Sequence, residues 1–535
     1  MSAEIQTVRA LRPPRCVIAL LLAAACLAPP LSMGATLRFA SAFDPQSLDP
    51  HALALQYQTR VISQIYESLV FRDRDFAIAP ALAVSWQAVE PKRWRFKLRA
   101  GVKFHDGTPF TADDVVFSIG RALMKNSQRA FQLRGVVEAR KVDDLTVDFI
   151  LSDPDAVLPE KLIYVGMMSK AWSEAHGVME PQNYNAKQET YAVRNTNGTG
   201  PYMLKSYESD TRTVLTANPS WWGKRGNVDE AIYLVIQSDA TRLAALVAGQ
   251  VDFVIDPPFQ DIPRLKQEAR FKLTEMPDIG MQYLGFDQSR DELQFADVKG
   301  RNPFKDLRVR RAVYQAIDIN AIVSKVLRGQ AMPTGAYLSR LIDGYAPALE
   351  KRLAYDPAAA RALLKEAGYP DGFSVTLDCV NVAFRAAVCQ AIAGMLAQVG
   401  IKTTFQVWPT ATFFPKLTQA TTSFFEFGWS PGTDAWPTLN AIVRSYGADG
   451  LGTFNGGRYS NPKLDQVIDA IRVEPDIAKR RQLVGNALQL MQVDLPLIPL
   501  YRRMLTWVMR PDIDVVQWPN DVLELRYVQI GDGRY

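Results

Sequence analysis

Histidine and cysteine are scarce in this sequence, which contains three histidines and four cysteines among 535 residues. The histidines, at positions 51, 105 and 176, do not show the spacing of a metal-binding motif. A phosphate-binding loop is also missing, because the glycine-rich segment "NGTGP" lacks the required lysine. These absences argue against zinc hydrolases and nucleotide hydrolases. We predict neither a metal nor a cofactor.

Long apolar runs are missing from all but the first 30 residues. Residues 17–28 form the stretch "VIALLLAAACLA", which follows three arginines and ends at two prolines. This stretch is too short to span a bilayer comfortably, and small residues follow it, as in a secretory signal peptide. We therefore predict a soluble periplasmic protein, exported by a signal peptide that comprises residues 1–35. The alternative is a lipoprotein anchored through Cys26.

An excess of charge of one sign is also lacking. The formal charge is +5, and removal of residues 1–35 takes away three arginines and one glutamate, which leaves +3. A nucleic-acid-binding protein would carry a basic surplus, so no nucleic-acid partner is expected.

Two cysteines remain in the predicted mature chain. Cys16 and Cys26 fall in the signal segment, whereas Cys379 and Cys389 lie ten residues apart in "LDCVNVAFRAAVC". Exported proteins meet an oxidising environment, so we predict a local disulfide. The alternative is two separately buried thiols. A metal site is disfavoured, because no histidine or third cysteine lies nearby.

What the sequence does contain is an alternation of short strands and helices. Residues 94–98 alternate apolar and charged side chains as a half-buried strand does, and Thr111 and Asp114 have the spacing of a capping box. Asp356 and Asp239 are further helix caps, and Gly249 and Gly368 end helices. Residues 373–379, 383–400 and 401–408 form a strand–helix–strand unit. The predicted class is α/β, with two or three structural units at this length.

The segment "GWSPG", residues 428–432, fits the G-x-S-x-G pattern of the nucleophile elbow in serine hydrolases. That mechanism needs a histidine base after the serine, but all three histidines precede Ser430. It also needs a backbone N–H directly after the serine, where this chain has Pro431. Serine hydrolysis therefore remains only a remote alternative, and we predict that the protein is not an enzyme.

Many segments, in chain order, resemble those of the family 5 solute-binding proteins of ABC importers, which bind oligopeptides, dipeptides and related solutes. They include "LRAGVKFHDGTPFTADDVVFSIGRA", "NTNGTGPYMLKSYE", "SDATRLAALVAGQVDFV", "PFKDLRVRRAVYQAID", "LLKEAGYPDGF", "FGWSPGTDAW" and "LPLIPLY". The resemblance implies a two-lobed periplasmic binding protein fold of type II, with a hinge and an interlobe cleft. Lobe I would comprise residues 36–277, with an extra subdomain, and 496–535. Lobe II would comprise residues 278–495.

The same resemblance implies a set of ligand-binding residues. Gly428, Trp429 and Ser430 match a strand-end loop that runs beside the ligand. An acidic residue that often pairs with a peptide amino group is replaced here by Gly432, with Asp434 as the nearest carboxylate. The remaining matches are Leu55, Gln56, Tyr57, Phe131, Asn381, Trp408 and Tyr501.

The function implied is capture of a peptide or peptide-like solute and its delivery to a membrane permease that works with ATPase subunits. The binding protein itself is expected to be a monomer. The alternative within the same fold is a non-peptide solute, such as a metal chelate, a sugar or an opine.

Overall fold

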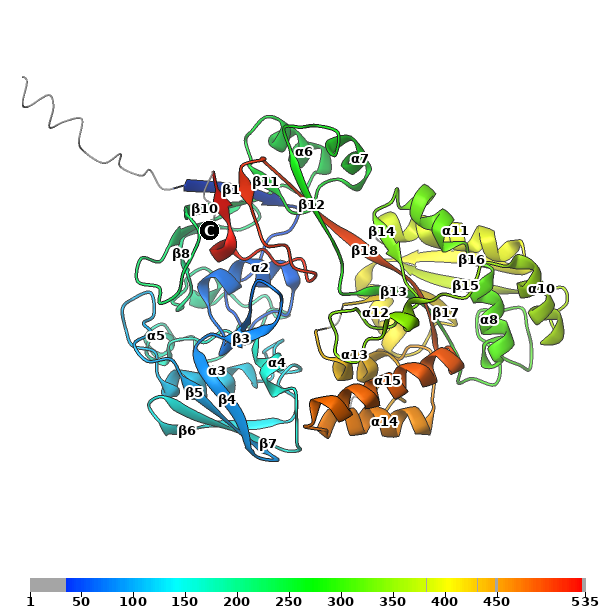
Figure 1. Cartoon of the computed structure of the whole chain (residues 1–535), viewed down its shortest axis with the longest axis horizontal. Helices are drawn as coiled ribbons and strands as arrows, with labels where there is room; N and C mark the ends of the chain where they lie inside the picture. The colour runs from blue at the N-terminus through cyan, green and yellow to red at the C-terminus, as the bar shows by residue number, and fades with distance from the viewer. Residues whose placement is uncertain (1–34, 382, 431, 448–450, 532–535) are drawn as a thin grey trace, which may run out of the picture.

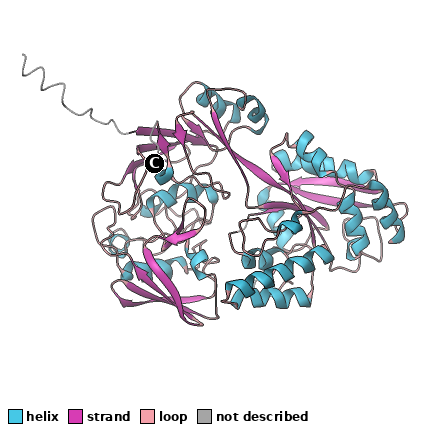
Figure 2. Ribbon diagram, viewed as in Figure 1, coloured by secondary structure: helices cyan, strands magenta, loops and turns pink. Residues whose placement is uncertain are grey.

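The computed structural model describes residues 35–381, 383–430, 432–447 and 451–531, so nearly all of the predicted signal segment lies outside the described residues. The chain forms two lobes of mixed strands and helices, joined by one long strand and by a second, shorter crossing segment beside it (Figure 1). Helices and strands occur in both lobes, as the colouring by secondary structure shows (Figure 2). The predicted α/β class is therefore confirmed.

The first lobe is built on a sheet in which β1 pairs in parallel with both β10 and β11. Its strands are β1 (Ala35–Ser41), β8 (Tyr202–Glu208), β9 (Arg212–Ala217), β10 (Val228–Val235), β11 (Phe253–Val254) and β12 (Lys272–Pro277). Its helices include α2 (Gln56–Ile65), α6 (Asp239–Val247) and α7 (Ile262–Leu265). Ser238, rather than the predicted Asp239, caps α6, because its side chain accepts the Thr241 N–H.

A four-stranded antiparallel sheet forms a separate subdomain of this lobe, in the order β4-β5-β7-β6. Its elements are β4 (Ala83–Glu90), β5 (Arg93–Leu98), β6 (Val136–Asp143), β7 (Thr146–Leu151) and α3 (Ala112–Ala122), with β2 (Val70–Arg72), β3 (Ile78–Pro80), α4 (Leu158–Leu162) and α5 (Lys170–Ala175) beside it. Thr111 and Asp114 form the predicted capping box of α3. Phe96, Phe149 and Ile119 pack in the core of this subdomain.

The second lobe contains the predicted strand–helix–strand unit, in which β15 and β16 pair in parallel along their whole length. Its strands are β13 (Met281–Phe286), β14 (Ala331–Pro333), β15 (Phe373–Val380), β16 (Ile401–Trp408) and β17 (Phe424–Trp429). Its helices include α8 (Leu307–Gln315), α10 (Pro357–Glu366), α11 (Ala383–Ala397), α12 (Thr410–Thr418), α13 (Ala435–Ile442), α14 (Pro462–Val473) and α15 (Ile477–Asp494). Asp356 caps α10 as predicted.

The predicted disulfide is confirmed, since Cys379 and Cys389 are bonded. The bond ties the end of β15 to α11. It therefore fixes the first turns of α11 against the end of the sheet.

The two lobes share β18 (Leu497–Met509), which continues from one into the other (Figure 1). Residues 497–503 of β18 pair with β13 and β14, and residues 504–509 pair with β11 and β12. A lobe boundary at residue 496 assigns all of β18 to lobe I, whereas the strand pairing divides it between the lobes. The reason is that β18 is one unbroken strand whose partners change near Arg503.

The second connection runs through residues 278–280, between β12 and β13, beside the point where β18 changes partners. Arg503 Nε donates to Asp278 Oδ2 at 3.0 Å, and Arg502 Nη1 donates to the carbonyl oxygens of Ile279 and Gly280, both at 2.9 Å. The two crossings between the lobes are thus bonded to each other.

Candidate functional site

The "GWSPG" segment begins at the end of β17, whose neighbour on one side is β13. Gly428 lies opposite Gln282, and a Cβ atom at position 428 would lie 2.3 Å from Gln282 Oε1, so the Gln282 side chain would have to move to make room for one. Trp429 is half-buried, and its Nε1 donates to Thr438 Oγ1 at 3.2 Å. Ser430 is exposed. Pro431 lies outside the described residues.

This loop continues into a contact between the two lobes. Thr433 Oγ1 donates to Glu160 Oε2 at 2.6 Å and also accepts a hydrogen bond from Arg72, so two side chains of the first lobe hold it. The ammonium group of Lys161 lies 5.7 Å from the ring centroid of Trp436. The lobes therefore meet directly beside the strand-end loop.

A cluster of polar side chains lies beneath Gly428, where β13, β17 and β18 run side by side. Glu426 is fully buried, and Arg385 of α11 donates to its Oε2 at 2.8 Å. Five buried atoms have no hydrogen-bond partner among the described residues: Gln282 Oε1, Tyr283 Oη, Arg385 Nη2, Glu426 Oε1 and Tyr501 Oη. Buried polar atoms are nearly always paired, so such a concentration marks a place where further polar groups belong.

Burial also governs the ionisation of this cluster. It raises the pKa of Glu426, and the neighbouring Arg385 guanidinium only partly offsets that effect. Burial likewise raises the pKa of Tyr501, with a further contribution from the Glu426 charge. Both tyrosines of the cluster therefore carry an O–H group that can donate.

The other predicted residues of the second lobe have partners within the protein. Trp408 is half-buried, and its Nε1 donates to Asp378 Oδ1 at 2.7 Å. Asn381 is exposed, and its backbone N–H donates to the Trp408 carbonyl at 2.8 Å. Asp434 caps α13 through the Trp436 N–H at 2.8 Å and forms a buried ion pair with Arg480. The carboxylate of Asp434 thus has partners on α13 and α15, which gives it a structural role.

Of the predicted residues of the first lobe, Leu55, Gln56 and Tyr57 lie at the start of α2, whereas Phe131 lies in the loop between α3 and β6. Leu55 precedes the helix, and Gln56 Nε2 donates to the carbonyl oxygen of Asn520. The Tyr57 ring stacks on Phe43, with 5.5 Å between centroids. Phe131 is 69% exposed. Among the hydrogen bonds, ion pairs and ring contacts of the described residues, none joins these side chains to residues 428–430.

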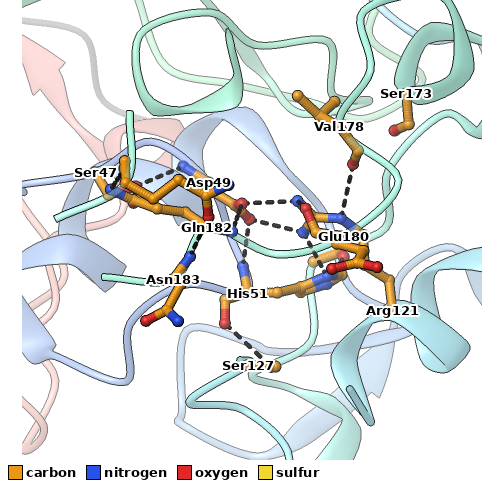
Figure 3. Close-up of polar contacts among 12 residues, drawn as sticks. Ser47, Asp49, His51, Arg121, Ser127, Ser173, Val178, Glu180, Gln182 and Asn183 are labelled. Carbon is orange, nitrogen blue, oxygen red and sulfur yellow. Dashed lines mark hydrogen bonds and ion pairs between the residues drawn. The ribbon is translucent and has the colours of Figure 1, made fainter. Parts of the chain in front are cut away.

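A buried network of Asp49, His51 and Arg121, which the sequence did not reveal, holds the segment before α2 (Figure 3). Arg121 Nη1 and Nη2 each donate to one oxygen of Asp49 at 2.7 Å, and neither side chain is exposed. His51 Nδ1 lies 3.1 Å from Arg121 Nη1, and His51 Nε2 lies 2.9 Å from the Gly166 carbonyl. Nδ1 therefore accepts and Nε2 donates, which describes a neutral imidazole. "SLDPH" contains both Asp49 and His51, but nothing local indicates the partner 72 residues away.

Burial and the charge of Arg121 set the pKa values of Asp49 and His51. Burial lowers the pKa of His51 to about 3, and the Arg121 charge adds to that effect. Burial alone would raise the pKa of Asp49, but Arg121 lowers it overall. Asp49 is therefore ionised and His51 neutral near pH 7.

The three histidines have partners that are far from Ser430 in sequence. His51 contacts Arg121 and Gly166, His105 Nε2 lies 3.1 Å from the Gly200 carbonyl, and His176 stacks on Tyr191. No hydrogen bond in the described part of the chain joins a histidine to Ser430.

The described residues contain no group of three or more histidine, cysteine, aspartate or glutamate side chains that could hold a metal ion. No helix among them is both long and apolar enough to cross a membrane.

Comparison with known proteins gives consistent relatives. The dipeptide-binding protein of Escherichia coli (strain K12) is 27% identical over 495 residues, covering 86% of this chain and 88% of the relative. Heme-binding protein A of Haemophilus influenzae is 27% identical over 466 residues, covering 82% of this chain and 81% of the relative. The structure of the Helicobacter pylori periplasmic binding protein DppA in complex with the peptide STSA matches 93% of this chain and 98% of its own, with a TM-score of 0.76 at 22% identity.

The profile of "Bacterial extracellular solute-binding proteins, family 5 Middle" matches residues 77–450, which is more than half of the chain. The sequence segments, the two-lobed fold and the relatives all point to the same family. This chain belongs to the family 5 bacterial extracellular solute-binding proteins.

Proposed function

We propose that this protein captures a small peptide or peptide-like solute between its lobes and delivers it to the permease of an ABC importer. The observation that carries this proposal is the cluster of unpartnered polar atoms around Glu426 and Arg385, next to the contact between the lobes. Peptides offer amide, amino and carboxylate groups that match such a mixture of donors and acceptors. The dipeptide-binding relative supports the choice of solute.

The proposed cycle contains no chemical step. Solute docks on one lobe, rotation about the two crossings brings the other lobe over it, and the closed protein docks on the permease. The solute stabilises the closed form only by its greater affinity for that form. Energy for transport comes from separate ATPase subunits. Export by the 1–35 signal peptide would place the monomeric protein in the periplasm.

The residues proposed to contact solute come from both lobes. Lobe I comprises residues 36–277 with 496–535, except that the first half of β18 pairs with lobe II, which comprises residues 278–495. The proposed contacts are Leu55, Gln56, Tyr57, Phe131, Asn381, Trp408, Gly428, Trp429, Ser430 and Tyr501. Asp434 is not among them, because its carboxylate is held by Arg480.

A thermal-shift screen across solute classes tests the function. Di- to pentapeptides are expected to raise the melting temperature, because a ligand that binds only the folded protein stabilises it. Metal chelates, sugars and opines form the other arms of the screen. The peptide assignment would be refuted if no peptide raised the melting temperature while a solute of another class did.

Trp429→Ala is expected to weaken solute binding at least about tenfold without unfolding the protein, because a half-buried aromatic wall is lost while the core is kept. Calorimetric titration with the stabilising peptide measures the affinity, and circular dichroism checks the fold. Val407→Ala, on an exposed position of the same lobe, is the control. Equal affinities of the wild type and Trp429→Ala would remove Trp429 from the site.

Gly432→Asp is expected to add preference for a free amino group. A Cβ atom at position 432 meets nothing within 4 Å, so the side chain fits, and it restores the carboxylate that related peptide binders often carry there. The measurement compares a dipeptide with its N-acetylated form. The ratio of their affinities should rise several-fold in the variant, since a charge-assisted hydrogen bond is gained. An unchanged ratio would contradict this placement of the solute's amino end.

Ser430→Ala is expected to leave any esterase activity of the preparation unchanged. The side chain is exposed and lacks a histidine partner in the described structure. Hydrolysis of a chromogenic ester by wild type and variant provides the comparison. A loss of a hundredfold or more would favour the hydrolase alternative.

A further inference from the structure

A small pocket lies in the first lobe between α2, the segment around Tyr164 and the C-terminal residues 518–526. Its volume is about 80 Å³. That space holds a few water molecules or the head group of a solute, but not a whole peptide, because sites for complete ligands are several times larger.

Arg129 lines this pocket and is only 2% exposed. Its Nη2 donates to Thr59 Oγ1 at 3.1 Å, whereas its Nε has no acceptor among the described residues. Burial lowers the pKa of Arg129 to about 10, so the guanidinium stays charged at neutral pH. A buried charge is costly when it lacks a partner.

The other arginines of the same pocket differ from Arg129 in having carboxylate partners. Arg72 pairs with Glu160, and Arg526 pairs with Glu524 at 2.7 Å. Arg129 forms no ion pair with any residue that the structure describes. Glu67 also lines the pocket, and its two oxygens accept hydrogen bonds from tryptophan side chains. Arg129 is therefore the arginine of the pocket lining that has no ion-pair partner among the described residues.

Ser127 links the backbone of Arg129 to His51, which belongs to the buried network with Asp49 and Arg121; Figure 3 shows the bond between Ser127 and His51. Ser127 Oγ donates to the His51 carbonyl at 3.1 Å and accepts the Arg129 N–H at 3.0 Å. The bond to Ser127 holds the Arg129 backbone, and the Nη2–Thr59 bond holds the guanidinium, so Arg129 has partners within the protein that preorganise it before any solute arrives.

The wall of the pocket is shared with the contact between the lobes. Arg72 lines the pocket and also donates to Thr433 of the second lobe. Trp518 lines the pocket and packs on Phe76, whose ring centroid is 5.7 Å away within a core that includes second-lobe residues. A group bound in the pocket can therefore extend from a solute that is held between the lobes.

We propose that this pocket is an anion subsite in which Arg129 binds a carboxylate of the captured solute. The planar donor edge of a guanidinium matches a carboxylate, and the small volume suits that flat group. The inference rests on the proposed function for the identity of the solute. The subsite itself can be probed with simple carboxylates.

The test compares wild type, Arg129→Gln and the control Arg134→Gln, which removes an exposed arginine from the same loop. The probes are succinate, chloride, alanyl-phenylalanine and alanyl-phenylalanine amide, with affinity measured by calorimetry. Succinate and the free dipeptide are expected to bind wild type and Arg134→Gln, with at least about tenfold loss in Arg129→Gln. The dipeptide amide should bind wild type more weakly than the free acid.

A second readout separates a binding role from a structural one. Without any probe, the melting temperature of Arg129→Gln should equal or exceed that of wild type, because a buried charge without an ion-pair partner is removed. A marked fall would indicate that Arg129 serves the fold and would overturn the proposal. The proposal would also be overturned if succinate bound wild type and Arg129→Gln equally, or if chloride bound as tightly as succinate.

Failure of the subsite and failure of the function give different results. If dipeptide acid and amide bind wild type and Arg129→Gln alike, the peptide function stands and the subsite is wrong. If succinate binding depends on Arg129 but no peptide binds, the subsite stands and the peptide assignment is wrong.

Discussion

Replacing Arg121 with methionine is expected to lower the free energy of unfolding by about 3–5 kcal/mol, because Asp49 then remains buried without a cation. His51 also loses the donor to its Nδ1. Chemical denaturation followed by tryptophan fluorescence measures the loss. Arg140→Met, which breaks an exposed pair with Glu138, should cost no more than about 1 kcal/mol.

A second change made in the Arg121→Met background identifies the cause. Asp49→Asn removes the stranded charge and keeps one side-chain oxygen, which can accept from the His51 N–H or the Gln182 N–H, whose acceptors in the wild type are the two different carboxylate oxygens. The double variant should therefore be more stable than Arg121→Met alone. If Arg121→Met lowers the free energy of unfolding no more than Arg140→Met does, the pair of Asp49 and Arg121 is not buried as the structure indicates.

Acid is expected to destabilise the protein steeply between pH 6.5 and about 3, with His51 as a main cause. The pKa of His51 is about 3 in the folded protein, compared with an ordinary value near 6.5. Between these values the unfolded chain binds a proton that the folded protein excludes, so stability is lost as the pH falls. His51 contributes at most about 1.4 kcal/mol per pH unit, or roughly 5 kcal/mol in total.

Unfolding free energies at several pH values measure this dependence. His51→Gln should reduce the slope below pH 6.5, since glutamine can still donate to Gly166 but does not titrate. His105, whose pKa burial lowers to about 4, acts in the same direction, so some slope should remain. His176→Gln, at an exposed position, is the control. Identical slopes for wild type and His51→Gln would contradict the neutral, buried imidazole.

Local features of the fold could be predicted from the sequence because their causes are local. The Thr111 capping box and the Asp356 cap involve residues two or three positions apart. The disulfide joins cysteines ten residues apart, and the strand–helix–strand unit is continuous in sequence. The prediction of a cap at Asp239 failed because its neighbour Ser238 makes the same bond one position earlier.

Features that depend on distant partners could not be predicted. Asp434 is engaged by Arg480, which lies 46 residues further along the chain. The division of β18 depends on which strands lie beside it, and a run of apolar residues does not reveal its partners. That Arg129 forms no ion pair with the residues described is likewise visible only in the folded structure. For these residues, the residue type can be read from the sequence, but its neighbours in the folded protein cannot.

Mass spectrometry of the solute released from the purified, full-length protein tests directly whether the protein captures a peptide-like solute. The protein is purified without added ligand and denatured, and the released small molecules are compared with those from Trp429→Ala prepared in parallel. We expect a peptide or peptide-like molecule with a free carboxylate, present in wild type and depleted in the variant. Release of a sugar or another solute without a carboxylate, in an amount equal to that of the protein, would contradict this expectation.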